Sequence, residues 1–413
     1  MGGPVLKNKE KEKKTNLLGF IFHLDHVGVT VMTLLIMQSL VYLAFNKGSL
    51  NPVARTIENF RLSDMFFEVD NEGEARDTSD LITIVDMTDV YDRGELADII
   101  NQIQACEPSV MGVDIVFNGF RNDTLGNERL VEAVCNTTST TVWAYKLIDW
   151  NNKNAQFERT YHSFFTELVD VDHEGFINVQ RDTNGGTVRT LGLHRPAEGR
   201  MEYSLSAQVA FAATNDSSII TKSKDCNIYY SSTYFPVVPS DSIAAHADQI
   251  RSHIVLLGAM RDLRDQHYTP IGKIPGVKIL AYTIQTLVQR RMPIDTPYWL
   301  TVIITFMLMW FVQILQFGSI KFLKKNPEAS IKYYLGDSGF VSSMISLGAI
   351  IALAFLSLLL FFHWNIYLNT AWAIMGIALL ANTRKFYALL VRILSSRTKW
   401  AFLSHSLFYF KAK

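Results

Sequence analysis

The chain has 413 residues, 48% of them apolar, and its 39 basic and 39 acidic side chains leave no net charge. This balance excludes a nucleic-acid-binding protein whose affinity comes from neutralising phosphates, because such a protein carries a basic excess. The apolar content excludes a disordered chain. The sequence is therefore that of a folded protein, and its apolar residues are concentrated in a few long segments.

Four segments are long and apolar enough to cross a bilayer, which takes about 20 residues. They are residues 27–45, 298–317, 340–362 and 364–383. Only His363 separates the third from the fourth, which predicts a helical hairpin with a very tight turn. We interpret the first segment as a retained anchor and not as a cleaved signal peptide, because Ala44-Phe45-Asn46 is a poor cleavage site.

Lysine and arginine are concentrated in residues 1–26, 318–339 and 384–413. With four spans these three regions lie on one side of the membrane, and the positive-inside rule makes that side cytoplasmic. Both termini are therefore expected in the cytoplasm, and residues 46–297 are expected outside it. The aromatic and basic residues of 384–413 predict either an interfacial amphipathic helix or a docking surface for another membrane protein.

The large segment 46–297 opens with a strand-helix-strand pattern. Residues 81–86 and 110–114 are short apolar runs that each end on an aspartate, and residues 95–105 between them have helical spacing. This predicts a βαβ unit with one aspartate at the carboxyl end of each strand. That edge is where open α/β sheets bind ligands.

The alternation of strands and helices continues along the segment. Helices are predicted at 126–135, 160–168, 203–213 and 277–290, and strands at 140–147, 228–234 and 252–258. Asn184-Gly185 lies between two extended runs, which predicts a β-hairpin. The expected fold is an α/β domain with a mixed, mainly parallel sheet and flanking helices, joined to a four-helix transmembrane region.

Asp86 and Asp114 are the first candidates for a site, because paired carboxylates can bind a divalent cation or act as acid and base. Each could instead cap the turn or helix that follows it, or orient Arg93. Asn118 and Lys146 are expected on the same edge of the sheet, so a polar ligand-binding pocket is predicted there.

Other motifs of catalysis are missing from the sequence. It has no glycine-rich phosphate loop, no nucleophile elbow and no Cys/His cluster with metal-ligand spacing. No catalytic residue, metal or cofactor is therefore expected. Asp265 is expected to pair with Arg93 or Arg261 and so to fix the loop after the strand at 252–258.

The predicted helix ends place two cysteines close together. Cys106 follows the first helix and Cys135 ends the second, and both ends lie on one edge of a parallel sheet. A disulfide between them is therefore feasible in an oxidising compartment. The alternative is that both are free thiols that pack as small apolar side chains.

An ordered series of short motifs runs through the large segment. The series comprises Ile84-Val85-Asp86, Arg93, Val113-Asp114-Ile115-Val116-Phe117, Gly175-Phe176-Ile177-Asn178, Gly185 to Arg189, Leu256-Leu257-Gly258, Asp265, Thr269-Pro270 and Pro275-Gly276-Val277. In this order, and followed by three spans, the series resembles CHASE2-domain proteins, a family of extracytoplasmic sensory domains. The family's Trp-Pro-Trp-Pro-Arg segment is reduced here to Tyr91-Asp92-Arg93. Where the family commonly continues into a cytoplasmic output domain, only residues 384–413 follow the last span.

The resemblance implies a multi-pass protein of the bacterial inner membrane that carries a periplasmic sensory or binding domain. Without an output domain, we expect it to act through other envelope or membrane proteins or through a homo-oligomer, and no nucleic-acid partner is expected. The expected ligand-binding residues are Asp86, Arg93, Asp114, Asn118, Lys146 and Asp265. A non-catalytic structural subunit of an envelope complex is the main alternative, and an enzyme that uses the two aspartates is the second.

Overall fold

The computed structural model describes residues 17–46, 61–72, 77–179, 186–328, 330–398 and 400–408. The chain forms two compact units. One, the α/β unit, contains residues 61–295 and 360–367. The other, the helical unit, contains the residues before 61, residues 296–359 and the residues after 367. The hairpin turn predicted at Asn184-Gly185 lies outside the described residues.

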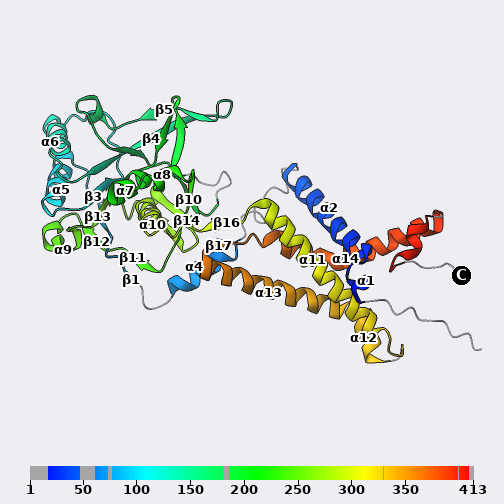
Figure 1. Cartoon of the computed structure of the whole chain (residues 1–413). Coiled ribbons are helices and arrows are strands. Elements are labelled where there is room, and N and C mark those ends of the chain that lie inside the picture. The colour runs from blue at the N-terminus through cyan, green and yellow to red at the C-terminus, as the bar shows by residue number, and fades with distance from the viewer. Residues whose placement is uncertain are drawn as a thin grey trace, which may run out of the picture. The chain divides into compact units, whose positions relative to one another are not determined.

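The described part of the α/β unit is built on a nine-stranded mixed sheet (Figure 1). Its centre is parallel, in the strand order β12-β2-β13-β3-β4. The bounds are β12 Val237–Pro239, β2 Ile82–Asp86, β13 Ile254–Gly258, β3 Val110–Val113 and β4 Thr141–Asn151. Helices cover both faces of this centre, which is why its strands are continuous apolar runs. The predicted mixed, mainly parallel α/β sheet is confirmed.

The other end of the sheet is largely antiparallel. The second half of β4 pairs with β5, β5 pairs with β8 in parallel and β8 pairs with β9, while β6 runs parallel to the first half of β4. The bounds are β5 Gln156–Tyr161, β6 Glu174–Phe176, β8 His194–Ala197 and β9 Arg200–Tyr203. The helix predicted at 160–168 is wrong. A single 3-10 turn, η2 Phe164–Glu167, buries the phenylalanines that gave the helical spacing.

Short strand pairs complete the α/β unit. They are β1 Asp77–Thr78 with β11 Thr233–Tyr234, β7 Thr190–Gly192 with β10 Asp225–Asn227, β14 Gln266–Thr269 with β15 Gly272–Pro275, and β16 Ile294–Asp295 with β17 Ile366–Tyr367. The single strand predicted at 228–234 is wrong, because two short strands with different partners flank that region. Apart from the β14–β15 hairpin, the paired strands lie far apart in sequence, so no local pattern marks those pairs.

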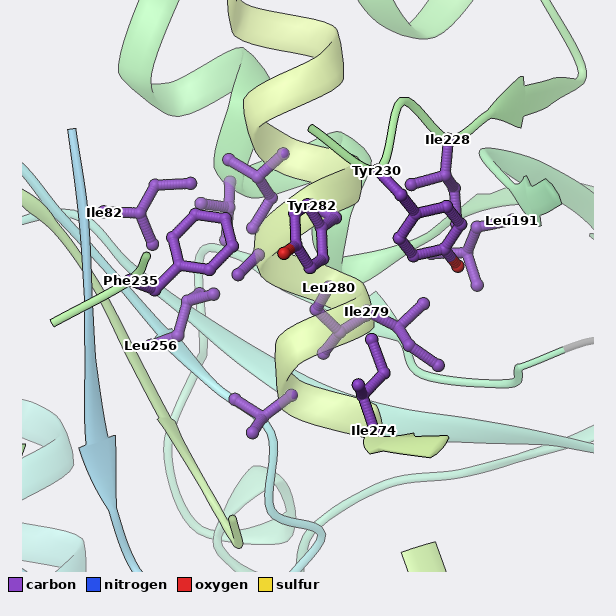
Figure 2. Close-up of a cluster of buried hydrophobic side chains, with 14 of the residues drawn as sticks. Ile82, Leu191, Ile228, Tyr230, Phe235, Leu256, Ile274, Ile279, Leu280 and Tyr282 are labelled. Atoms are coloured by element: carbon purple, nitrogen blue, oxygen red, sulfur yellow. The ribbon is translucent and has the colours of Figure 1, made fainter. Parts of the chain in front are cut away.

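Two helices pack on each face of the parallel centre. Helices α5 Arg93–Ala105 and α6 Thr124–Cys135 share a buried apolar cluster with one face of the sheet, and α7 Leu205–Thr214 and α10 Gly276–Val288 share another with the opposite face. Figure 2 shows Ile279 and Tyr282 of α10 among side chains of the second cluster, including Ile82 and Leu256 of the sheet. Caps define where the helices begin: the Asp92 carboxylate, for example, accepts the Glu95 N–H at 2.9 Å.

The three cysteines are free thiols. Cys106 is buried in the apolar cluster beneath α5, whereas Cys135 is exposed at the end of α6. Cys106 and Cys135 are not bonded in the structure, which has the alternative arrangement, two free thiols.

A small cluster, the junction cluster, joins four segments that are distant in sequence. Arg61 Nη1 lies 3.0 Å from Asp295 Oδ1, and the Arg61 guanidinium lies 5.0 Å from the centre of the Tyr367 ring. Asn227 Nδ2 donates to the other carboxylate oxygen of Asp295 at 3.0 Å. Arg61 precedes helix α4 Ser63–Glu72, Asp295 ends β16 and Tyr367 ends β17.

The described residues contain four helices long and apolar enough to cross a membrane. They are α2 Leu24–Asn46, α11 Tyr298–Leu323, α13 Phe340–Trp364 and α14 Ala371–Arg397. The very tight turn predicted at His363 is wrong, because α13 continues to Trp364 and residues 365–370, which include β17, precede α14. Asn365 has a φ of +52°, a left-handed conformation that ends the helix.

After α14 ends at Arg397, the described residues form a 3-10 turn, η5 Ala401–His405, and not the predicted amphipathic helix. Two residues after this turn contact the start of α2. The Ser406 hydroxyl donates to both carboxylate oxygens of Asp25, and the Leu407 N–H donates to one of them. The Tyr387 hydroxyl of α14 donates to the same carboxylate at 3.1 Å.

A buried polar network links α11, α13 and α14. Arg384 of α14 is 7% exposed; its Nη1 donates to Gln316 Oε1 at 3.2 Å and its Nη2 to Ser342 Oγ at 2.9 Å. Gln316 Nε2 in turn donates to Ser346 Oγ at 2.8 Å. No carboxylate among the described residues pairs with Arg384. Gln313, three residues before Gln316, is also fully buried, but neither of its amide atoms has a hydrogen-bond partner in the described part of the chain.

These two glutamines should respond oppositely to replacement by leucine. Gln316→Leu removes an acceptor from a buried guanidinium and should destabilise the helical unit by about 1 kcal/mol. Gln313→Leu removes a buried amide without partners and should be neutral or stabilising. Thermal unfolding of the purified full-length protein in one detergent would compare them, and equal losses in both variants would contradict the network.

Candidate functional site

Three neighbouring strands end at one level on the carboxyl edge of the sheet. Gly258 of β13 pairs with Asp86 of β2, and the Asp114 N–H, directly after β3, donates to Leu257 O at 2.8 Å. Because β13 lies between β2 and β3, two strand spacings, or about 10 Å, separate the two aspartates. They are therefore too far apart to share a cation or a proton, and the predicted pairing of the two carboxylates is wrong.

Asp86 ties two loops together. Its Oδ1 accepts the Thr88 N–H at 2.9 Å and the Met260 N–H at 3.1 Å, and its Oδ2 lies 3.2 Å from Arg261 Nε. Arg261 also pairs with Asp89 at 2.5 Å. Burial acts to raise the pKa of Asp86, but the hydrogen bonds from Thr88 and Met260 and the Arg261 charge outweigh it and hold the pKa below its ordinary value.

Arg93 is a second structural group. It is 3% exposed, its Nη2 donates to the backbone carbonyls of Asn118 at 3.1 Å and Gly119 at 2.7 Å, and its Nη1 donates to the Asn127 side chain. Its guanidinium also lies 4.2 Å from the centre of the Phe164 ring. Arg93 and Asn118 therefore fix the loop between β3 and α6, and both lie away from the pocket that contains Asp114.

A pocket of about 340 Å³ opens beside Asp114. Its lining residues are Asp114, Lys146, Ile177, Asn178, Val179, Asp265, His267, Gly276 and Leu280. Three of the six predicted site residues are thus brought together, namely Asp114, Lys146 and Asp265. Asp86, Arg93 and Asn118 are not among the lining residues. We call this the edge pocket.

The alternation of side chains explains why Asp114 and Lys146 share the edge pocket. Val110 of β3 and Val142 of β4 belong to the apolar cluster on the α7 and α10 face. Asp114 lies four residues after Val110 and Lys146 lies four residues after Val142, so both are on that same face. The strand register pairs Val113 with Trp143, so Asp114 lies beside Ala144. Lys146 is two residues further along β4, a distance of about 7 Å along the strand.

Asp265 caps α10 at the wall of the edge pocket. Its Oδ2 accepts the Gly276 N–H at 3.2 Å, and its Oδ1 lies 3.2 Å from His267 Nε2. A carboxylate at this end of a helix is stabilised by the helix dipole. The predicted pairing of Asp265 with Arg93 or Arg261 is wrong, because Arg93 bonds to the β3–α6 loop and Arg261 bonds to Asp86 and Asp89.

Asp114 and Lys146 are opposite charges that do not pair. Among the described residues, neither side chain has a hydrogen bond or an ion-pair partner. Burial raises the pKa of Asp114 well above its ordinary value, the nearby Asp265 raises it further, and Lys146 acts in the opposite direction. Asp114 is thus a half-buried carboxyl group with its oxygens available to a ligand.

Asn178 and His267 are pocket residues that the sequence did not single out as ligand-binding. The Asn178 side chain accepts the Leu147 N–H and donates to the Leu147 carbonyl, both at 2.8 Å, so it continues the pairing along β4. The sequence feature that could have identified Asn178 was its position at the end of the motif Gly175-Phe176-Ile177-Asn178. Nothing in the local sequence marked His267, which the hairpin of β14 and β15 brings to the edge pocket.

Residues 32–315 match the sequence model of the CHASE2 domain. The chain belongs to the CHASE2 family. The matched region covers more than half of the 413 residues and includes the whole edge pocket, so the resemblance carried by the ordered motifs is confirmed. CHASE2 is a sensory and not a catalytic family, and the match supports a sensory, extracytoplasmic role. Comparisons with curated proteins and with solved structures gave no match.

The two edge aspartates should affect stability with opposite signs. Asp86→Asn weakens charge-assisted hydrogen bonds and should cost about 1–3 kcal/mol near neutral pH. Asp114→Asn removes a carboxyl group whose ionisation is unfavourable in the fold and should stabilise the unliganded protein near neutral pH.

The pH dependence supplies the control. An unfolded aspartate titrates near 3.8. Asp114 has a raised pKa in the folded protein, so the stability that it contributes is fully present below 3.8 and is lost as the pH rises through the raised pKa. Asp86 has a lowered pKa, so the stability that it contributes is present above 3.8 and is lost as the pH falls through the lowered pKa. Thermal unfolding of both variants between pH 3 and pH 8 would test this, and a loss of stability in Asp114→Asn at neutral pH would contradict it.

Proposed function

We propose that this protein is a membrane-anchored CHASE2 sensor that binds an extracytoplasmic ligand in the edge pocket and passes its state to partner proteins. The observation that carries the proposal is the unpaired Asp114 and Lys146 in a pocket at the carboxyl edge of a parallel sheet. Asp114 is a half-buried carboxyl group without a partner, which is unfavourable unless a ligand uses it, and Lys146 places an exposed ammonium group in the same pocket. The role is one of recognition: the carboxylates of the pocket have no activated nucleophile beside them in the described chain.

The route from the pocket to the membrane segments is short in the chain. Helix α10 begins at the pocket wall with Gly276 and ends at Val288, and β16 follows at Ile294. β16 pairs with β17, which belongs to the segment between α13 and α14, and the residues after β16 lead into α11. A movement of α10 on ligand binding would therefore act on the junction cluster, where segments connected to all the later spans meet.

We further propose that the protein lies in the bacterial inner membrane with both termini in the cytoplasm. The basic regions before α2, between α11 and α13, and in and after the second half of α14 support this orientation. The CHASE2 assignment of the large unit supports its periplasmic side.

Reporter fusions would test this orientation. A fluorescent protein fused after Lys413 should fold and fluoresce, whereas alkaline phosphatase fused there should be inactive. The same two reporters inserted after Lys153, on an exposed turn of the α/β unit, should give the reverse result. Active phosphatase at the C-terminus would overturn the proposed topology.

The sensory role predicts that partner binding depends on the edge pocket. Full-length wild type and the variant Asp114→Asn with Lys146→Met would be cross-linked in native membranes and purified, and the captured proteins quantified by mass spectrometry. We expect the amount of at least one membrane partner to change several-fold in the variant. Lys153→Ala, which removes an exposed lysine of the same unit, is the matched control and should leave the pattern unchanged.

A structural envelope subunit would behave differently. It would hold its partners in a fixed stoichiometry that neither pocket substitution alters. That result, with the variant folded as judged by its thermal unfolding, would contradict the sensory proposal.

A further inference from the structure

The charges of the edge pocket restrict the chemistry of its ligand. Asp114 presents a half-buried carboxyl group, and Lys146 presents an ammonium group about two residues of strand length away on the neighbouring strand. Asp265 also lines the pocket, but its two oxygens already contact His267 and the Gly276 N–H. The groups left available to a ligand are thus one carboxyl group and one ammonium group.

A ligand with a single charge satisfies only one of these groups. A metal cation or a simple amine bound to Asp114 would place a second positive charge next to Lys146. A phosphate or a simple carboxylate bound to Lys146 would face Asp114 and Asp265, and like charges at such distances repel. A ligand that carries both charges can place its ammonium group on Asp114 and its carboxylate on Lys146, so that each of these two groups meets an opposite charge.

The size and the remaining lining of the pocket restrict the ligand further. A volume of about 340 Å³ is near the lower end of the range for ligand pockets, about 300–1,000 Å³, so the site suits a small metabolite and not a nucleotide or a folded peptide. Ile177, Val179 and Leu280 provide an aliphatic wall. No Phe, Tyr or Trp side chain lines the pocket within the described residues, so the large aromatic platform that commonly stacks on sugar rings or bases is missing there.

We infer that the edge pocket binds a small aliphatic α-amino acid as its zwitterion, with the ammonium group on Asp114 and the carboxylate on Lys146. The aliphatic side chain packs against Ile177, Val179 and Leu280. This inference rests on the proposed function and specifies its ligand.

The amino-terminal end of α10 adds to the selectivity for a carboxylate. The helix has 13 residues, and its positive dipole end faces the pocket, where Asp265 already accepts the first N–H. A ligand carboxylate held by Lys146 would lie close to this end. Binding would therefore pull Lys146 of β4 and the start of α10 toward one another, which is a displacement of the helix that leads to the junction cluster.

Matched probes can separate the two charges. L-leucine, 3-methylbutylamine and 4-methylpentanoate share their aliphatic part, but only L-leucine carries both charges; L-valine tests a shorter chain. Binding to the full-length protein in lipid nanodiscs would be measured by isothermal titration calorimetry. We expect L-leucine or L-valine to bind at least tenfold more tightly than the amine or the acid.

Variants assign each charge to its residue. Asp114→Asn and Lys146→Met should each weaken binding of the amino acid at least tenfold, while Lys153→Ala should have no effect. Asp114→Asn is expected to be at least as stable as the wild type, so its loss of binding would not reflect unfolding. Lys146 is exposed, and its substitution should be tolerated as well.

Two outcomes overturn the inference: the amine or the acid binds as tightly as the amino acid, or neither amino acid binds. The proposed function is judged separately, by a thermal-shift screen of other small polar metabolites on the same nanodiscs. A ligand from that screen whose effect is abolished by Asp114→Asn would leave the sensory role standing with a different ligand class. If the screen finds no ligand and the pocket variants capture the same partners as the wild type, both the amino-acid inference and the proposed function are contradicted.

Discussion

The close approach of α10 to the sheet edge is the constraint on which the site depends. A side-chain carbon at Gly258 would lie 2.7 Å from Val277, so α10 can begin where it does only because β13 ends in glycine. With the helix start held there, Asp265 reaches the Gly276 N–H, and the β14–β15 hairpin brings His267 to the same wall. Any larger residue at position 258 would push α10 outward, open the pocket wall and disturb the apolar cluster of Figure 2 together.

Asp86 and Asp114 show how one sequence pattern yields two physical situations. Both end an apolar strand and both lie level with Gly258, yet hydrogen bonds and Arg261 lower the pKa of the first, while burial raises the pKa of the second. The difference is set by the loop after β13, which donates Met260 and Arg261 to one side only. The fold thus satisfies Asp86 with hydrogen bonds and an ion pair, whereas the Asp114 side chain has no partner among the described residues.

Local sequence predicted the elements whose signal is local. The buried strands β2, β3 and β13 and the helices α5, α6, α7 and α10 follow from continuous apolar runs, helical spacing and caps. The grouping of Asp114, Lys146 and Asp265 was predicted only as a common edge. The insertion of β13 between β2 and β3 was not predictable, because residues 254–258 lie about 140 positions further along the chain and no local feature encodes their partners. The same reason hid the pair β16–β17, and with it the junction cluster. The β14–β15 hairpin, which brings His267 to the pocket, is local in sequence but was not predicted.

The contrast between the α10 core and the junction cluster suggests how a sensor of this kind transmits a signal. α10 is buried along almost its whole length in a close-packed core. The Arg61–Asp295 pair has side chains 30% and 49% exposed, and ion pairs of this kind contribute about 0–1 kcal/mol. Two-residue strands such as β16 and β17 are equally weak. A small part of a ligand's binding free energy is enough to make or break interactions of this size. A ligand moves such an equilibrium only by its differential affinity for the two states.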